Sequence, residues 1–176
     1  MSDPIPPGVE VVVRPMEFGS PDYQTAVALR YAVLRAPLGL EWSQAELDDE
    51  PRCFHFCGFA EARLIATLLL KPIDRRTVKM RQVTVHPAWQ GKGAGAAMVG
   101  FAEVFARERG FDRVTAHARS TAMDFYTRLG YSVVGEPFIE NTIPHILVVK
   151  ELASGSPPAV RDSPPSRAGH SASPPL

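Results

Sequence analysis

The chain has 176 residues, a length that predicts one folded domain rather than two. Its 19 lysines and arginines balance 19 aspartates and glutamates, so the formal net charge is zero and a general nucleic-acid binder, which needs excess positive charge, is disfavoured. Hydrophobic residues make up 45% of the chain, which excludes a wholly disordered protein and provides enough apolar surface for a core.

The two ends of the chain differ in composition from its centre. The first eight residues hold three prolines and lack the basic and apolar regions of a signal peptide, and no stretch approaches the ~20 apolar residues of a membrane span. We therefore expect a cytoplasmic protein without a membrane partner. Residues 153–176 contain six prolines, six serines and no aromatic residue, a composition that predicts a disordered tail. We expect residues 1–8 to be flexible and residues 9–152 to fold.

Two cysteines, Cys53 and Cys57, flank His55 in a segment that is predicted to be a strand. At about 3.3 Å per residue, a strand separates the two Cα atoms by about 13 Å. A disulfide needs less than about 7 Å, and both sulfurs would have to lie ~2.3 Å from a shared metal ion. We therefore expect neither a disulfide nor a metal site here.

The first half of the chain has the periodicity of one strand, one helix and a meander of three strands. A short β-branched run over residues 9–13 predicts a strand, and apolar residues at helical spacing predict a helix over 22–36, ended by Pro37 and Gly39. Three apolar runs then predict antiparallel strands over 53–60, 64–71 and 77–85.

The second half begins with a glycine-rich turn and an amphipathic helix that ends at Gly110. Strands are predicted over 113–117, 131–134 and 143–150, with a helix over 121–129 that starts at a Thr-x-x-Asp capping sequence. This order predicts a mixed α/β (α+β) fold with an antiparallel centre, not a doubly wound nucleotide fold. We expect the apolar face of the first of these helices to pack on the sheet through Ala97, Met98, Phe101, Val104 and Phe105, with Glu103, Arg107, Glu108 and Arg109 facing water.

The glycine turn, Gly91-Lys92-Gly93-Ala94-Gly95, lies between a predicted strand and a predicted helix. Glycines allow close backbone approach, and the free N–H groups of a helical first turn attract an anion, so the turn can hold a phosphate. It lacks the Gly-Lys-Ser/Thr of a P-loop and the spacing of the dinucleotide motif, which disfavours ATP and NAD. The alternative is a purely structural tight turn.

Two motifs resemble signatures of the GNAT acetyltransferases. Gln90-x-x-Gly93-x-Gly95 is similar to that family's acyl-CoA pyrophosphate motif, and Phe125-Tyr126-Thr127-Arg128-Leu129-Gly130-Tyr131 is similar to its second signature. The resemblance covers residues 9–152. The segments 29–35 and 143–145 most resemble the small ElaA-like branch of the family. The family's fold is a mostly antiparallel central sheet flanked by helices on both faces.

The resemblance implies that acetyl-CoA is the co-substrate. It implies that pantetheine binds the strand backbone near Val83 and Val85 and that the pyrophosphate lies over the turn. Many relatives carry an asparagine that contacts the cofactor where this chain has Arg119, so that contact is in question. The implied cofactor-binding residues are Val83, Thr84, Val85, Gln90, Gly91, Lys92, Gly93, Ala94, Gly95 and Ala96.

Acetyl transfer to an amine requires removal of the amine proton and protonation or stabilisation of the leaving thiolate. Tyr126 lies about 100° around its predicted helix from Phe125, at the edge of the apolar stripe, where its hydroxyl can act as the acid. The alternative is a tyrosine at the edge of the core with a local hydrogen bond. His145 begins an apolar strand and is our candidate base. The alternative is that it is only a solvated histidine at the end of a strand. His55, His86 and His117 compete for that role.

The expected function is N-acetyl transfer from acetyl-CoA to the primary amine of a small molecule by direct transfer. A peptide or protein amine and a non-catalytic acyl-CoA-binding module are the alternatives, and a homodimer stays open. In the family, the region between the first helices borders the acceptor site. Here that region is acidic and either attracts a cationic amine or forms a solvated loop: Glu41, Glu46, Asp48, Asp49 and Glu50.

Overall fold

The computed structural model describes residues 10–153. The flexible segment predicted over residues 1–8 lies outside this range, as does nearly all of the tail predicted over 153–176. Within the range, no helix has both the length and the apolar character that crossing a bilayer requires.

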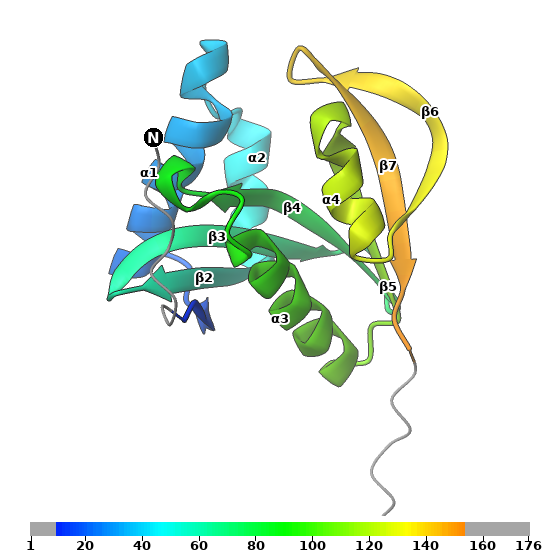
Figure 1. Ribbon diagram of the computed structural model, residues 1–176, viewed down its shortest axis with the longest axis horizontal. Helices are drawn as coiled ribbons and strands as arrows, with labels where there is room; N and C mark the ends of the chain where they lie inside the picture. Colours follow the sequence, from blue (N-terminus) through cyan, green and yellow to red (C-terminus); the bar gives the residue numbers. More distant parts are fainter. Residues whose placement is uncertain (1–9, 154–176) are drawn as a thin grey trace, which may run out of the picture.

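Seven strands form one sheet in the order β1-β2-β3-β4-β5-β7-β6 (Figure 1). Every neighbouring pair is antiparallel except β4 and β5, which run parallel. This arrangement confirms the predicted mixed fold with a mostly antiparallel sheet. The strands are β1 (Val12–Met16), β2 (Phe54–Ala60), β3 (Arg63–Pro72), β4 (Thr77–Val85), β5 (Arg113–Arg119), β6 (Ser132–Glu140) and β7 (Ile143–Glu151).

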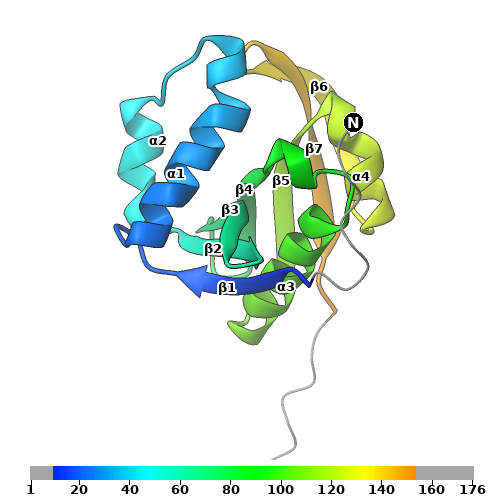
Figure 2. The same ribbon diagram turned by 60° about the vertical axis from the view of Figure 1, so that its left-hand side comes forward.

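Helices cover both faces of the sheet, as the resemblance implies. Helices α1 and α2 lie on one face, and α3 and α4 lie on the other (Figure 2). Residues 65–70 of β3 are all buried because this central strand is covered from both sides. The helices are α1 (Pro21–Leu34), α2 (Gln44–Asp49), α3 (Ala94–Glu108) and α4 (Met123–Arg128), with short 3₁₀ turns η1 (Ala36–Leu38), η2 (Glu50–Arg52), η3 (Pro87–Trp89) and η4 (Ser120–Ala122).

Strands β4 and β5 separate partway along their length. Their parallel register runs from Thr77 opposite Arg113 only as far as Met80 opposite Ala116. Beyond this point β4 continues to Val85 with β3 as its partner. A β-bulge at Gln82, whose φ is +54°, interrupts that pairing where the two strands part. The edge of β4 that faces β5 therefore has no strand partner over residues 83–85.

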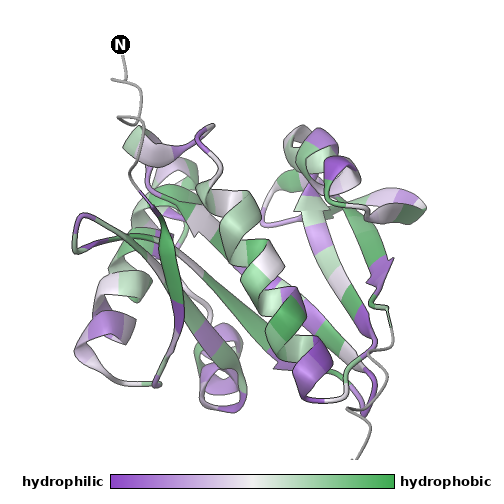
Figure 3. Ribbon diagram, turned by 60° about the horizontal axis from the view of Figure 1, so that its bottom comes forward, coloured by the Kyte–Doolittle hydropathy of each residue, from purple (hydrophilic) through white to green (hydrophobic). Residues whose placement is uncertain are grey.

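The hydrophobic core lies between the sheet and α3, and Figure 3 shows hydrophobic colouring along the central strands and this helix. The predicted apolar face of α3 is partly wrong. Met98 and Phe105 are buried as expected, whereas Val104 is exposed and Ala102 and Ala106 are buried instead. The face is rotated because Glu103, expected in water, bonds to Tyr131 and Lys150 beside α4 and β7: its Oε1 lies 2.9 Å from Tyr131 Oη, and its Oε2 2.8 Å from Lys150 Nζ.

Three other predicted elements shift. Strand β1 spans Val12–Met16 and pairs with β2 from Val12 opposite Phe59, so Glu10 and Val11 of the strand predicted over 9–13 lie before it, and residue 9 lies outside the described range. Strand β6 extends to Glu140, since a β-bulge after Val134 allows its pairing with β7 to resume at Phe138. The predicted Thr121 cap is wrong: Thr121 lies inside η4, and Ala122 precedes α4 without any side-chain cap.

Candidate active site

A cavity of about 740 Å³ opens where β4 and β5 part. One wall comes from the end of α1 and from α2, and the opposite wall from the hairpin of β6 and β7. Its floor includes the β4 bulge at Gln82 and the adjacent Val83. The cavity gathers Tyr126, His117 and His145, which lie on three different elements.

The Tyr126 side chain lines this cavity and is otherwise buried. Its ring contacts Phe125 and Tyr131 edge-on, with centroids 5.1 and 5.4 Å away. Burial raises the pKa of Tyr126 to about 12, so the hydroxyl carries its proton at neutral pH. No side chain or carbonyl within residues 10–153 hydrogen-bonds the hydroxyl. A purely structural tyrosine at the core edge is expected to have a local hydrogen bond, and this part of the chain provides none.

His145 lies on β7 in the same cavity and is 5% exposed. Its Nδ1 lies 2.9 Å from the carbonyl oxygen of Ile143, and a carbonyl can only accept, so Nδ1 carries the proton. The neutral ring then has its lone pair on Nε2. That atom lies 3.8 Å from Glu140 Oε2, and a carboxylate at this position would stabilise a protonated ring.

The three competing histidines have other partners. His55 Nε2 bonds the Glu50 carbonyl oxygen at 2.7 Å beneath Tyr23, and burial lowers the pKa of His55. His86 caps η3 by accepting a hydrogen bond from the Ala88 N–H. His117 reaches the cavity, where its Nδ1 lies 3.0 Å from Glu140 Oε1 and 3.1 Å from Lys79 Nζ.

Glu140 was not predicted as a site residue, yet it joins both cavity histidines. Burial would raise the pKa of Glu140, but the hydrogen bond with His117 and nearby positive charges lower it, so the side chain is ionised. The sequence offers one weak signal for it. Glu140 directly precedes the Asn141-Thr142 turn, and both turn residues have positive φ. A tight hairpin of this kind brings Glu140 opposite Ile143, close to His145.

The glycine turn has the geometry that an anion site requires. Gly91 and Gly93 have φ values of +70° and +89°, which favour glycine, and a Cβ on either would meet no atom within 4 Å. No side chain caps α3, and its first hydrogen bond runs from Ala97 N to Gly93 O. The N–H groups of the first helical turn therefore point out of the helix end. The residues present fit a pyrophosphate group.

Other predicted cofactor residues hold the turn and the bulge in place. The Gln90 amide donates to the Val85 carbonyl oxygen at 2.9 Å, which ties the turn to β4. Thr84 is buried, and its hydroxyl donates to the Gln82 carbonyl oxygen at 2.9 Å. Gly95 is packed against the Phe125 ring, 3.2 Å from where its Cβ would be. Of the rest, Val83 reaches the cavity, Lys92 lies over the Trp89 ring, Ala94 is buried and Ala96 is exposed.

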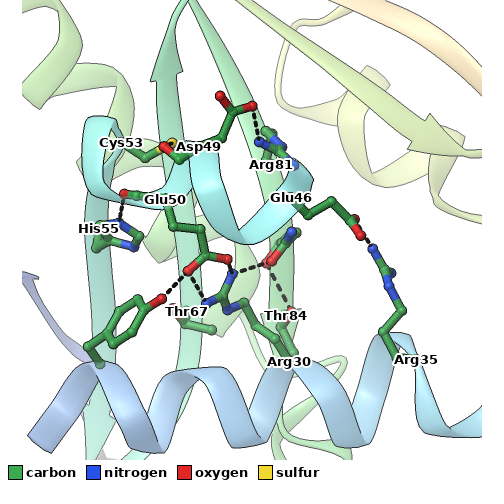
Figure 4. Close-up of polar contacts among 12 residues, drawn as sticks. Arg30, Arg35, Glu46, Asp49, Glu50, Cys53, His55, Thr67, Arg81 and Thr84 are labelled. Atoms are coloured by element: carbon green, nitrogen blue, oxygen red, sulfur yellow. Dashed lines mark hydrogen bonds and ion pairs between the residues drawn. The ribbon is translucent and has the colours of Figure 1, made fainter. Parts of the chain in front are cut away.

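A buried polar network holds the bulge from the α1 side (Figure 4). Arg30 Nη1 and Nη2 donate to the Glu50 carboxylate at 2.7 and 2.9 Å, and the Tyr23 hydroxyl donates to the same group. Arg30 also donates to the side-chain oxygen of Gln82. Burial would raise the pKa of Glu50, but the hydrogen bonds from Arg30 and Tyr23 lower it. The network connects α1, η2 and β4 at the cavity floor.

Three of the five carboxylates in the acidic region, those of Glu46, Asp49 and Glu50, are neutralised by ion pairs. Each carboxylate is already engaged: Glu46 with Arg35, Asp49 with Lys71 and Arg81, Glu50 with Arg30, Glu41 with the Tyr31 hydroxyl and Asp48 with the Gln44 amide. These contacts disfavour the prediction that the cluster attracts a cationic amine, because neighbouring cations neutralise most of its charges.

Both cysteines are free thiols. Cys57 is buried in β2, and burial raises its pKa to about 11. Cys53 precedes that strand and its thiol donates to the Asp49 carbonyl oxygen at 3.4 Å. In the described range, no three or more His, Cys, Asp or Glu side chains are grouped to hold a metal ion.

Known structures share this fold, and residues 21–131 match the acetyltransferase (GNAT) family. A putative N-acetyltransferase from Lactobacillus plantarum is 28% identical with a TM-score of 0.69, over 82% of this chain and 98% of that one. Escherichia coli ElaA is 21% identical with a TM-score of 0.68, over 81% and 99%. A GNAT acetyltransferase from Elizabethkingia anophelis, crystallised with acetyl-CoA, is 18% identical with a TM-score of 0.65, over 81% and 98%. The resemblance to the family, with the ElaA fold among its neighbours, is confirmed. The chain belongs to the GNAT acetyltransferases and is an acyltransferase with acetyl-CoA as its co-substrate.

Proposed function

We propose that this acetyltransferase moves the acetyl group of acetyl-CoA directly to the primary amine of a small molecule. The observation that carries the proposal is the cavity of about 740 Å³ that both Tyr126 and His145 line. This volume lies within the roughly 300–1,000 Å³ that is usual for small-molecule sites. A polar cavity with a protonated tyrosine and a histidine whose Nδ1 is bonded to a backbone carbonyl contains the two groups that the reaction needs.

In the proposed reaction, the amine nitrogen attacks the thioester carbonyl, so an N–C bond forms and the C–S bond breaks. His145 Nε2 takes the proton that the amine loses, and Glu140, 3.8 Å away, stabilises the imidazolium. The Tyr126 hydroxyl gives its proton to the departing sulfur. Its raised pKa favours this role, because the hydroxyl stays protonated until the thiolate forms.

We propose that acetyl-CoA lies between β4 and α3. The pantetheine would bind the unpaired edge of β4 at residues 83–85, where β5 no longer pairs with this strand. The pyrophosphate would bind the first-turn N–H groups of α3 above Gly91 and Gly93. In this arrangement Gln90 and Thr84 support the site through their hydrogen bonds to the β4 backbone rather than through the ligand.

A protein or peptide amine is the second candidate acceptor. The cavity is bordered on one wall by α2 and on the other by the β6–β7 turn. Its volume of about 740 Å³, which is usual for a small-molecule site, favours a small molecule. A panel of small amines and lysine-containing peptides, assayed with acetyl-CoA by release of free thiol, tests the choice.

Faster turnover on peptides would replace our acceptor with the second candidate. Tight binding of acetyl-CoA with no transfer to any amine would instead identify a non-catalytic module. The homodimer and the cytoplasmic location remain predictions. Light scattering of the full chain and fractionation of the source cells would test them.

A further inference from the structure

The cavity wall carries more positive than negative side chains. Its cations are Arg35, Lys71, Lys79, Arg81 and Arg119, and its carboxylates are Glu41, Glu46, Asp49 and Glu140. Arg35, Lys71 and Arg81 pair with these carboxylates, and Lys79 lies against His117. Within residues 10–153, Arg119 alone among the five forms neither an ion pair with a carboxylate nor a hydrogen bond with a histidine.

Arg119 makes one hydrogen bond in the described chain. Its Nη2 donates to the carbonyl oxygen of Leu34, the last residue of α1, over a long 3.4 Å. A guanidinium has five N–H donors, so most of its capacity stays unused. Burial, together with the positive charge of Arg35, lowers the pKa of Arg119. An arginine that is partly buried beside another cation is stabilised by a bound anion.

Arg35 lies beside Arg119 and converges on the same carbonyl oxygen. Its Nη1 also donates to Leu34 O at 3.4 Å, so the two nitrogens lie within twice that distance of each other. Arg35 is 4% exposed and stacks over the Trp42 ring at 4.4 Å, and its buried Nε has no acceptor. The carbonyl oxygen has two lone pairs and can accept both hydrogen bonds. The two guanidinium groups still keep further N–H donors, Arg35 Nε among them, for a ligand.

The register of the sheet places this pair next to the candidate base. Arg119 on β5 lies directly opposite His145 on the antiparallel strand β7. Directly opposed residues have Cβ atoms about 4.5–5.5 Å apart and project to the same face. Both side chains line the cavity. An anion bound by Arg119 would therefore lie only a few bonds from an amine bound near His145.

We propose that Arg119, supported by Arg35, binds a carboxylate of the acceptor, so that the substrate is an amino acid or another small amine with a carboxylate close to its amino group. This inference rests on the proposed function and names its substrate class. A carboxylate fits the planar forked donors of arginine, which can bind it through two parallel hydrogen bonds.

The first test compares acceptors in the full chain. Each L-amino acid is assayed beside its carboxamide and beside the amine that lacks the carboxylate, with acetyl-CoA and detection of free thiol. We expect KM for the carboxylated amine to be about 10–100 times lower, because charge-assisted hydrogen bonds are lost in the other two. O-phosphoethanolamine serves as a phosphate-bearing amine. Preference for it, or equal KM values throughout the series, would overturn the carboxylate assignment.

The second test compares variants. Arg119→Gln should raise KM for the carboxylated amine about 10–100-fold and leave KM for the carboxamide unchanged, and Arg119→Lys should fall between. Arg113→Gln is the matched control, since Arg113 lies on the same strand, is half exposed and pairs with Glu151 at 2.6 Å. It should change neither KM. If Arg119→Gln weakens calorimetric binding of acetyl-CoA and affects both acceptors equally, then Arg119 serves the co-substrate and the proposal is wrong.

Failure of the proposed function is distinguishable from failure of this inference. If the wild-type chain acetylates no amine, the proposed function fails, and calorimetry with N-acetyl amino acids in the presence of CoA then decides the inference. Tighter binding of the N-acetyl amino acid than of its carboxamide, lost in Arg119→Gln, would support the carboxylate site. Equal or undetectable binding of the two would refute it.

Discussion

Arg30 and Glu50 form an ion pair in which both side chains are only 1% exposed, with Nη1 of the arginine 2.7 Å from Oε1 of the glutamate. The pair joins α1 to η2, and through Gln82 it reaches the bulge where β4 leaves β5. Removing one partner from a buried pair leaves an uncompensated charge in the interior. The floor of the cavity therefore depends on a contact that neither proposed substrate would make.

Glu50→Gln should lower the free energy of unfolding by about 3–5 kcal/mol, because it leaves the Arg30 guanidinium buried without its counter-charge. Asp22→Asn provides the control. It breaks the Arg14–Asp22 pair, whose side chains are 50% and 37% exposed, and should cost about 0–1 kcal/mol. Urea unfolding at pH 7 measures both. Similar losses in the two variants would contradict the importance of the buried pair.

The same pair predicts how stability depends on pH. The pKa of Glu50 is lowered in the folded state, so the carboxylate binds its proton more weakly there than in the unfolded chain. Its contribution is present above the unfolded pKa of about 4.3 and is lost as pH falls through the folded value. Between about pH 5 and 3, unfolding free energy should fall less steeply in Glu50→Gln than in the wild type. Parallel curves would show that Glu50 does not titrate as its contacts require.

A negative charge introduced at the start of α3 should change the affinity for acetyl-CoA without lowering the stability of the fold. Ala96 is exposed in the first turn of this helix. Ala96→Glu should leave stability unchanged or raise it by about 0.3–1 kcal/mol through the helix dipole, while repelling the pyrophosphate. We expect acetyl-CoA to bind about 5–30 times more weakly, since one nearby charge is worth about 1–2 kcal/mol.

Ala96→Gln matches the glutamate in size and should keep most of the affinity, as measured by calorimetry. Substituting Gly93 would be a weaker test, because its φ of +89° strains any other residue and would confound the result. Unchanged affinity in Ala96→Glu would place the pyrophosphate elsewhere.

Tyr126 and His145, the proposed acid and base, should differ in their response to pH. Tyr126→Phe removes only the hydroxyl and should lower turnover by about 10²–10⁴-fold with little change in acetyl-CoA binding. Because the pKa of Tyr126 is about 12, the wild type should keep its acid in protonated form through pH 10.

His145→Ala should also slow the reaction at neutral pH, but its defect should shrink at higher pH, where the amine arrives already deprotonated. Tyr126→Phe should show no such recovery, since a neutral amine does nothing for the leaving sulfur. Rate profiles from pH 6 to 10 compare the two variants. If the defects run in parallel, the division into acid and base is wrong.

Local patterns in the sequence were sufficient to predict most of the fold and the position of the glycine turn. The run over residues 77–85 coincides with β4, and the spacing of Gly91 and Gly93 matches two positions that adopt positive φ. These features depend on near neighbours, because hydrophobic period and glycine backbone freedom act over a few residues.

Only the tertiary structure decided which polar groups share the cavity. Arg119 lies opposite His145 because strands β5 and β7 pair in a particular register, and Glu140 lies near His145 across a hairpin. Acidic residues that are neighbours in the sequence have different partners in the fold, and Glu50 is buried against Arg30. Such contacts depend on burial and on pairing between distant segments, which local periodicity does not encode.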